Sequence, residues 1–144
     1  MTTDNATSRW EQQRDGSFIP ERIFAYRDTP RDNGGWQTPT YGTNAGGQGT
    51  PWFGVQFRKD SLGYVHLRGH VLFSGAVAPA ATILTLPAGY RPGVQHRQVS
   101  WGSPGGTEQA LRLDFVTDGT VFSNATFANT NWVSFNGIHY LAEG

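Results

Sequence analysis

The side chains in this sequence that are best suited to bind a ligand are aromatic rings and amides in its C-terminal half. Proteins hold saccharides by stacking aromatic rings on the sugar face and by hydrogen bonds from amides. Six residues supply such groups: Tyr90, Trp101, Asn124, Asn129, Asn131 and Trp132. We interpret them as a candidate saccharide platform. The alternative is that the tryptophans pack in a core and the asparagines form turns.

The residue types that metal binding requires are absent or badly spaced. The chain has no cysteine, which excludes disulfides and thiolate metal sites. His66 and His70 are four residues apart, which on a strand separates them by roughly 13 Å. One chain cannot chelate a metal with that pair, so we expect a solvated polar strand face there. The alternative is a ring of three symmetry-related histidines on an oligomer axis.

Catalytic patterns are missing too. There is no Gly-x-Ser-x-Gly elbow, and no carboxylate pair stands out at the separation that glycoside hydrolysis needs. Asp60 and Asp118 fit turns, and Asp114 fits the polar face of a strand. We therefore predict a protein that is not an enzyme and has no cofactor. A small glycosidase using Asp114 and Glu108 is the remote alternative.

The composition favours one all-β domain. The 144 residues have zero formal net charge, only 15% charged residues, 19 glycines and 13% aromatics, a profile typical of turn-rich β proteins. Without a basic excess we expect no nucleic-acid binding, and without a long apolar run no membrane insertion. The N-terminus shows no secretory signal.

Alternating apolar residues predict a first hairpin, with strands around Phe57 and Val65 and a bridge over residues 59–63. We expect Phe57 to face Val65, Val55 to face Leu67, and Phe53 to face Gly69. This register places every apolar side chain on one face.

A second hairpin is predicted around Asp118-Gly119, a pair that favours a two-residue type I′ turn. This turn would place Phe115 opposite Phe122.

The last expected strand, residues 131–141, carries apolar side chains on both sides. One side holds Val133, Phe135 and Leu141, and the other holds Trp132, Ile138 and Tyr140. One explanation is a bulge at Gly137, where the side that faces the core changes. The alternative is a strand buried on both faces, with the second face against another subunit. With seven or eight such strands, we predict an antiparallel β-sandwich or jelly roll over residues 51–144.

Residues 1–50 differ from the rest, being rich in Gly, Pro, Asn and Thr towards residue 50. We predict an extended N-terminal arm pinned to a particle by a few large side chains. These anchors are Trp10, Phe18, Ile23, Phe24, Trp36 and Tyr41. The alternative is a long loop folded over its own domain.

Four segments in order, residues 59–69, 85–92, 118–121 and 132–138, make the chain resemble the C-terminal modules of bacteriophage tail-fibre, minor tail and receptor-binding proteins. Gly34-Gly35-Trp36 and Tyr41 are similar to the lead-in of these modules. The resemblance implies a homotrimeric jelly roll displayed on a virion, which adheres to a host-surface saccharide or protein without catalysis.

Such modules usually end a longer chain, whereas only about 50 residues precede the expected sandwich here. If the chain is complete, residues 1–50 must dock on other virion proteins of the tail or capsid. That raises a second role within the same hypothesis, a head fibre or capsid decoration protein. The alternative of another class is a monomeric carbohydrate-binding module.

Overall fold

The computed structural model describes residues 35–143, and these form eleven strands and one short 3-10 turn. The strands are β1 Thr40–Tyr41, β2 Ala45–Gly47, β3 Gln56–Lys59, β4 Tyr64–Arg68, β5 His70–Phe73, β6 Thr82–Thr85, β7 His96–Gly102, β8 Gln109–Phe115, β9 Thr120–Ser123, β10 Trp132–Ser134 and β11 His139–Leu141. The 3-10 turn η1 spans Pro104–Gly106. The predicted all-β class is confirmed. No helix among the described residues is long and apolar enough to cross a membrane.

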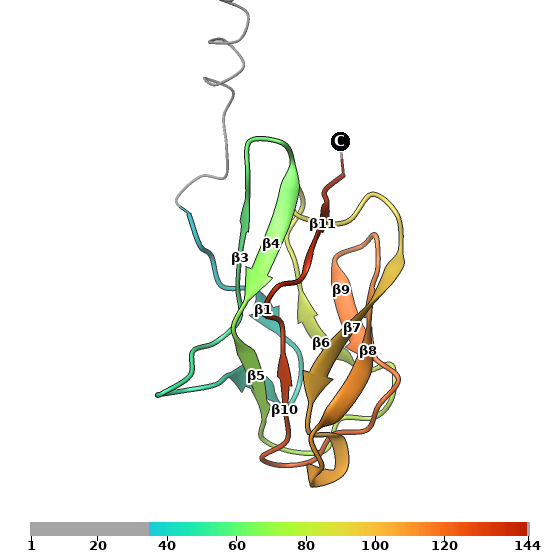
Figure 1. Cartoon of the computed structure of the whole chain (residues 1–144). Coiled ribbons are helices and arrows are strands. Elements are labelled where there is room, and N and C mark those ends of the chain that lie inside the picture. The colour runs from blue at the N-terminus through green and yellow to red at the C-terminus, as the bar shows by residue number, and fades with distance from the viewer. Residues whose placement is uncertain (1–34, 144) are drawn as a thin grey trace, which may run out of the picture. The chain divides into compact units, whose positions relative to one another are not determined.

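The strands form two antiparallel sheets (Figure 1). The larger one has the order β1-β6-β9-β8-β7-β10-β5-β2 and is nearly closed, and the smaller one has the order β11-β4-β3. The chain passes between the sheets at Gly69, between β4 and β5, and again between β10 and β11. These two crossing points bind each other, because the Gly69 N–H donates to Asn136 Oδ1 (2.7 Å) and the Gly69 carbonyl accepts from Phe135 N (2.8 Å).

The core lies between the sheets and takes apolar side chains from both. Its largest fully buried members are Phe57, Phe73, Phe115, Phe127 and Phe135. Phe73 and Phe127 stack with ring centroids 4.2 Å apart. The alternation of apolar residues along β3, β5 and β8 places Phe57, Phe73 and Phe115, since every second side chain points inward. Phe127 enters the core from the connection between β9 and β10.

The register predicted for the first hairpin is wrong by two residues. Phe57 pairs with Leu67, and Lys59 pairs with Val65. The turn lies later in the chain than predicted, and Asp60 stabilises it, since its Oδ1 accepts the N–H groups of Leu62 (2.9 Å) and Tyr64 (3.1 Å). A shift of two keeps the parity of the strands, so the predicted apolar face is still the buried one.

The residue opposite Gly69 also differs from the prediction. A Cβ on Gly69 would lie 2.1 Å from the Gly54 carbonyl oxygen, and Phe53 is 47% exposed. Gly69 therefore makes room for the neighbouring backbone and not for a phenyl ring.

The predicted type I′ turn of the second hairpin is wrong, and so is its register. Phe115 pairs with Val121, and the half-buried Phe122 pairs with Asp114. A type I′ turn needs positive φ at both central residues, but of Asp118 and Gly119 only Gly119 has it (+95°). The loop therefore takes three residues, closed by a hydrogen bond from Val116 N to Thr120 O (3.0 Å).

The last predicted strand is two strands, β10 and β11, which belong to different sheets. Asn136 and Gly137 form a turn between them, with Gly137 at φ +80°. The change of direction brings Ile138 and Tyr140 to the same core as Val133 and Phe135. The strand is therefore not buried on two faces, and Leu141 on its outer side is 56% exposed.

Two connections of the larger sheet repeat each other at an offset of 50 residues. Val77, between β5 and β6, and Phe127, between β9 and β10, exchange two backbone hydrogen bonds of 2.9 and 3.0 Å. Ala80 N then donates to Ser123 O, and Thr130 N to Phe73 O, each at 2.8 Å. These reciprocal bonds fix β10 beside β5 and β6 beside β9.

The folded part of the chain begins before residue 51, where we had placed the domain boundary. β1 pairs with β6 and β2 pairs with β5 in the larger sheet. The guanidinium carbon of Arg68 lies over the Trp36 ring, 4.0 Å from the centre of that ring, and the Tyr41 hydroxyl accepts from Val55 N (2.9 Å). These two expected anchors thus contact their own domain. The other four, Trp10, Phe18, Ile23 and Phe24, lie outside the described residues.

Candidate functional site

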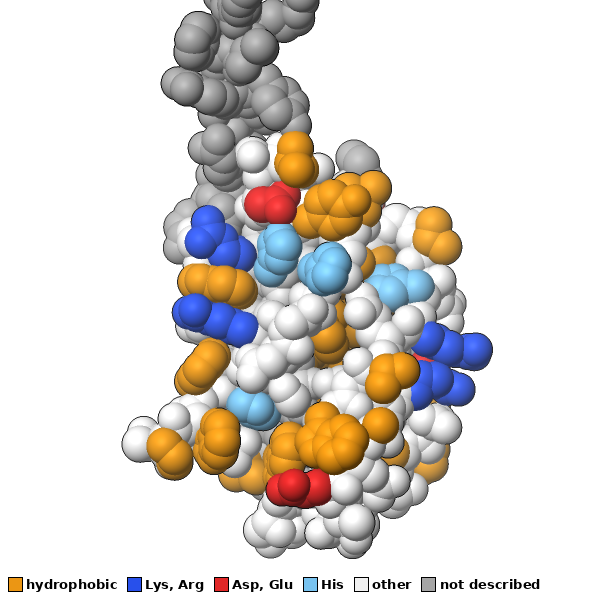
Figure 2. All heavy atoms as spheres, in the orientation of Figure 1, with side chains coloured by type: hydrophobic (Ala, Val, Ile, Leu, Met, Phe, Trp, Pro, Cys, Tyr) orange, Lys and Arg blue, Asp and Glu red, His pale blue; other side chains and the backbone are white. Residues whose placement is uncertain are grey.

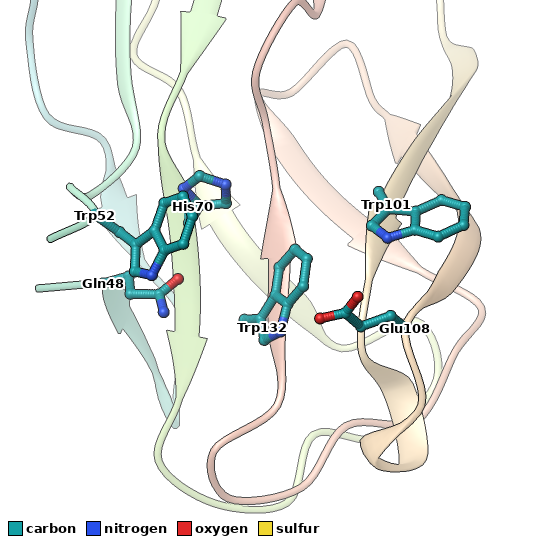
Figure 3. A pocket seen from close by; sticks show the side chains of 6 residues that line it. All are labelled: Gln48, Trp52, His70, Trp101, Glu108 and Trp132. Carbon is teal, nitrogen blue, oxygen red and sulfur yellow. The ribbon is translucent and has the colours of Figure 1, made fainter.

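A groove of about 400 Å³ lies on the outer face of the larger sheet, over β5, β10 and β7. Figure 3 shows the side chains that line it, Gln48, Trp52, His70, Trp101, Glu108 and Trp132. In Figure 2, hydrophobic side chains gather with one acidic group on this lower part of the face. The groove thus combines three indoles with a single carboxylate.

The register of the central strands explains why these rings meet. Ser134 of β10 pairs with His70 of β5, and Val133 pairs with Gly102 of β7. Trp132 is two residues from Ser134 on the same face, which makes it a diagonal neighbour of both His70 and Trp101. Such neighbours are about 7–8 Å apart, within reach of aromatic side chains. Three strands that are distant in sequence therefore form one aromatic row.

Trp52 reaches the row from the loop between β2 and β3. Its ring lies edge-on to His70, with centroids 5.2 Å apart, and Trp132 approaches the same imidazole at 5.8 Å. The two indoles enclose His70, which is only 8% exposed although it lies on the outer face of its strand. The solvated strand face predicted for His70 is therefore wrong, because a residue from another loop covers it.

His70 is a neutral base in this setting. Burial disfavours the imidazolium and lowers the pKa of His70 below its usual value. Its Nδ1 is buried and has no hydrogen-bond partner in the described structure. A neutral ring suits the contacts with two indoles and adds no charge to the groove.

The tryptophans differ in how firmly they are held. Trp52 and Trp101 are 55% and 51% exposed, while Trp132 is half-buried. The backbone of Trp132 is held by two hydrogen bonds to Ser103, since its N–H donates to Ser103 Oγ (3.0 Å) and its carbonyl accepts from Ser103 N (2.9 Å). Trp132 thus forms the floor of the groove, and the other two indoles present open faces.

Glu108 lies just before β8, after the 3-10 turn. Asn131 anchors that turn, because its Oδ1 accepts from Gly105 N (3.2 Å) and Ala128 N (2.8 Å). The Gln109 amide donates to the carbonyl of Thr107 (3.2 Å). Among the described residues, Glu108 makes no ion pair and is exposed.

Two of the six expected ligand residues, Trp101 and Trp132, lie together in the groove. Tyr90 lies elsewhere, edge-on to Phe57 at 4.9 Å, with its hydroxyl bonded to the Gln37 amide (2.7 Å). Asn131 is 6% exposed and serves the turn described above. Asn124 and Asn129 are exposed in the loop between β9 and β10 and do not line the groove.

The sequence reasoning missed four lining residues. Gln48 and Trp52 belong to a segment that was assigned to the arm or to its boundary. His70 was assigned to solvent, and Glu108 was weighed only as a hydrolytic carboxylate. The one signal for these residues in the sequence was Trp52, because a tryptophan in a Gly- and Pro-rich loop usually packs on a neighbouring surface.

The described residues contain no group of three or more His, Asp and Glu side chains that could hold a metal. His66 is bonded to Asp60 instead, with 2.8 Å between Nε2 and Oδ2. Glu108 and Asp114 are six residues apart on extended chain, about 20 Å, whereas paired glycosidase carboxylates lie about 5–9.5 Å apart. What the groove can do chemically is stack on flat apolar faces and accept hydrogen bonds. Comparison with family models, curated proteins and solved structures returned no match to this chain.

Proposed function

We propose that this protein is a non-catalytic adhesion module that binds a saccharide in the tryptophan groove. The observation that supports it is the row of three indoles from two strands and a loop, two of them about half exposed, around one hollow. Exposed indoles cost solubility unless a ligand uses them. Sugar rings match them, since their apolar faces stack on aromatic planes while hydroxyls bond to Gln48 and Glu108.

The size of the groove fits a short saccharide segment. Its volume lies at the lower end of the range of about 300–1,000 Å³ for small-molecule sites. We propose that the module recognises the end or a short stretch of a surface glycan.

From the family resemblance we propose that the protein is displayed on a bacteriophage particle as a homotrimer. Val94 and Val99 are 75% and 77% exposed, and such side chains suit burial against a neighbouring copy. A stable interface needs about 800 Å² from each subunit. Residues 1–33 would then dock on a tail or capsid protein.

The groove is tested by a glycan array followed by titration calorimetry on the full chain. Trp101→Ala should weaken binding about 5- to 100-fold, the range of one lost stacking contact. Leu62→Ala is the control, because Leu62 is 61% exposed in the turn between β3 and β4 and lies outside the groove. An array that stays blank with folded protein, or equal losses in both variants, would refute the proposal.

The place of display is tested with particles that lack residues 1–33 of this protein, since every described strand remains. Lost particle association together with glycan binding by the isolated protein supports a tail adhesin. Lost association without any glycan binding supports capsid decoration. A monomer that binds glycans supports the alternative, a carbohydrate-binding module of another origin.

A further inference from the structure

We propose that the saccharide bound in the groove carries a protonated amino group, as in a non-acetylated amino sugar, and that Glu108 binds this ammonium. The inference rests on the saccharide-binding function proposed above and specifies its ligand. It is argued from the charge of the groove and from the position of Glu108 between two indoles.

The groove has one formal charge, and within the described part of the chain that charge makes no ion pair. Of its six lining residues only Glu108 brings a formal charge, because burial lowers the pKa of His70 and the others are an amide and three indoles. The arginines on the neighbouring part of β7 and β8 are engaged elsewhere. Arg112 and Arg97 both bind Asp114, at 2.7 and 3.5 Å. A ligand with one positive charge would therefore neutralise the carboxylate of Glu108 in the groove.

The position of Glu108 suits an ammonium group bound beside a sugar ring. Figure 3 shows its carboxylate pointing toward Trp132, in the space between Trp132 and Trp101. Indole faces attract cations more strongly than other aromatic rings do. An amino sugar can thus stack its ring on one indole while its ammonium meets both the carboxylate and the electron-rich face of the other.

Other saccharides use this arrangement less fully. A neutral N-acetylated sugar can stack and can donate a hydroxyl to Glu108, but it gains nothing from the charge. An acidic sugar would place two negative groups together, which is unfavourable. The structure thus ranks ligands in the order amino, neutral and acidic.

The test is titration calorimetry on the full chain with glucosamine oligomers and N-acetylglucosamine oligomers of equal length at pH 6. We expect the amino oligomer to bind about tenfold more tightly. Glu108→Gln keeps the shape and one acceptor oxygen, so it should abolish the preference by weakening the amino oligomer much more than the N-acetyl oligomer. At pH 9 the wild-type preference should vanish, because the amine of the sugar loses its proton.

Equal affinity of the wild type for both oligomers, or a preference that survives in Glu108→Gln, would overturn the inference. Binding of only another neutral or acidic glycan on the array would overturn it as well, while the saccharide function stands. Failure of every glycan to bind would overturn both. Trp101→Ala should weaken both oligomers, which separates the stacking contribution from the charge.

Discussion

Replacing Gly102 by alanine should separate two strands that carry the groove. Gly102 is the last residue of β7 and pairs with Val133 of β10. A Cβ at this position would lie 2.6 Å from the Trp132 carbonyl oxygen, 2.7 Å from Leu111 Cδ2 and 3.2 Å from Val133 Cα. The leucine methyl can rotate away, but the carbonyl belongs to the paired strand and already accepts from Ser103 N. Relief therefore requires that β10 moves.

The magnitude follows from two contributions. Overpacking of a tight site costs about 1–3 kcal/mol. The Ser103–Trp132 hydrogen bond, which the movement of β10 would disturb, is worth about 1 kcal/mol. We expect the free energy of unfolding to fall by about 2–4 kcal/mol. For a domain near 100 residues, with about 4 °C for each kcal/mol, the melting temperature should fall by about 8–16 °C.

The assay is thermal unfolding of the full chain, followed by circular dichroism. Gly46→Ala is the matched control, since Gly46 lies in β2 of the same sheet and an added Cβ there meets nothing within 4 Å. The control should melt within a few degrees of the wild type. The same displacement should move Trp132 away from Trp101 and weaken saccharide binding. A Gly102→Ala protein that melts with the control would refute the packing argument.

Three further predictions concern pH, charge and assembly. Because burial lowers the pKa of His70 in the folded protein, the unfolded chain binds more protons than the folded one as the pH falls below about 6.5. The free energy of unfolding, measured by denaturant titration, should therefore fall from pH 7.5 to 5.0. The same titrations of His70→Phe should show a smaller loss. Asp114→Asn should cost about 1–3 kcal/mol in urea unfolding, since Arg112 and Arg97 lose the buried carboxylate that both bind. Of those partners, Arg112→Ala should cost more than Arg97→Ala, because Arg97 is 3.5 Å away and mostly exposed; equal costs would contradict this. Light scattering on the full chain and on residues 34–144 should give a trimer in both, and a monomer in both would count against display as a trimer.

Much of the local structure could be predicted from the sequence. Alternation of Val55, Phe57, Val65 and Leu67 identified the first hairpin and its buried face, and both hold in the structure. Leu113 and Phe115 of the second hairpin alternate in the same way and are buried in the core. Period-2 patterns report only which side of a strand is apolar, so they survive a register shift of two residues.

Hairpin registers could not be predicted, because they depend on single turn residues. In both hairpins a glycine with positive φ, Gly63 or Gly119, ends a three-residue loop that an aspartate stabilises. The Asp-Gly pair is compatible with two- and three-residue loops alike. The three-residue loop places Val121, and not Phe122, opposite Phe115.

The sequence by itself determined an all-β chain with exposed aromatic side chains, and it singled out Trp101 and Trp132. Only the tertiary structure decided that these two rings share a groove with Trp52, His70 and Glu108. The pairing of β10 with both β5 and β7 joins segments that lie 30 to 60 residues apart, and no local pattern encodes that order. The tertiary structure also shows that His70, which we expected on a solvated strand face, is buried. Burial depends on what packs above a strand and not on the strand alone.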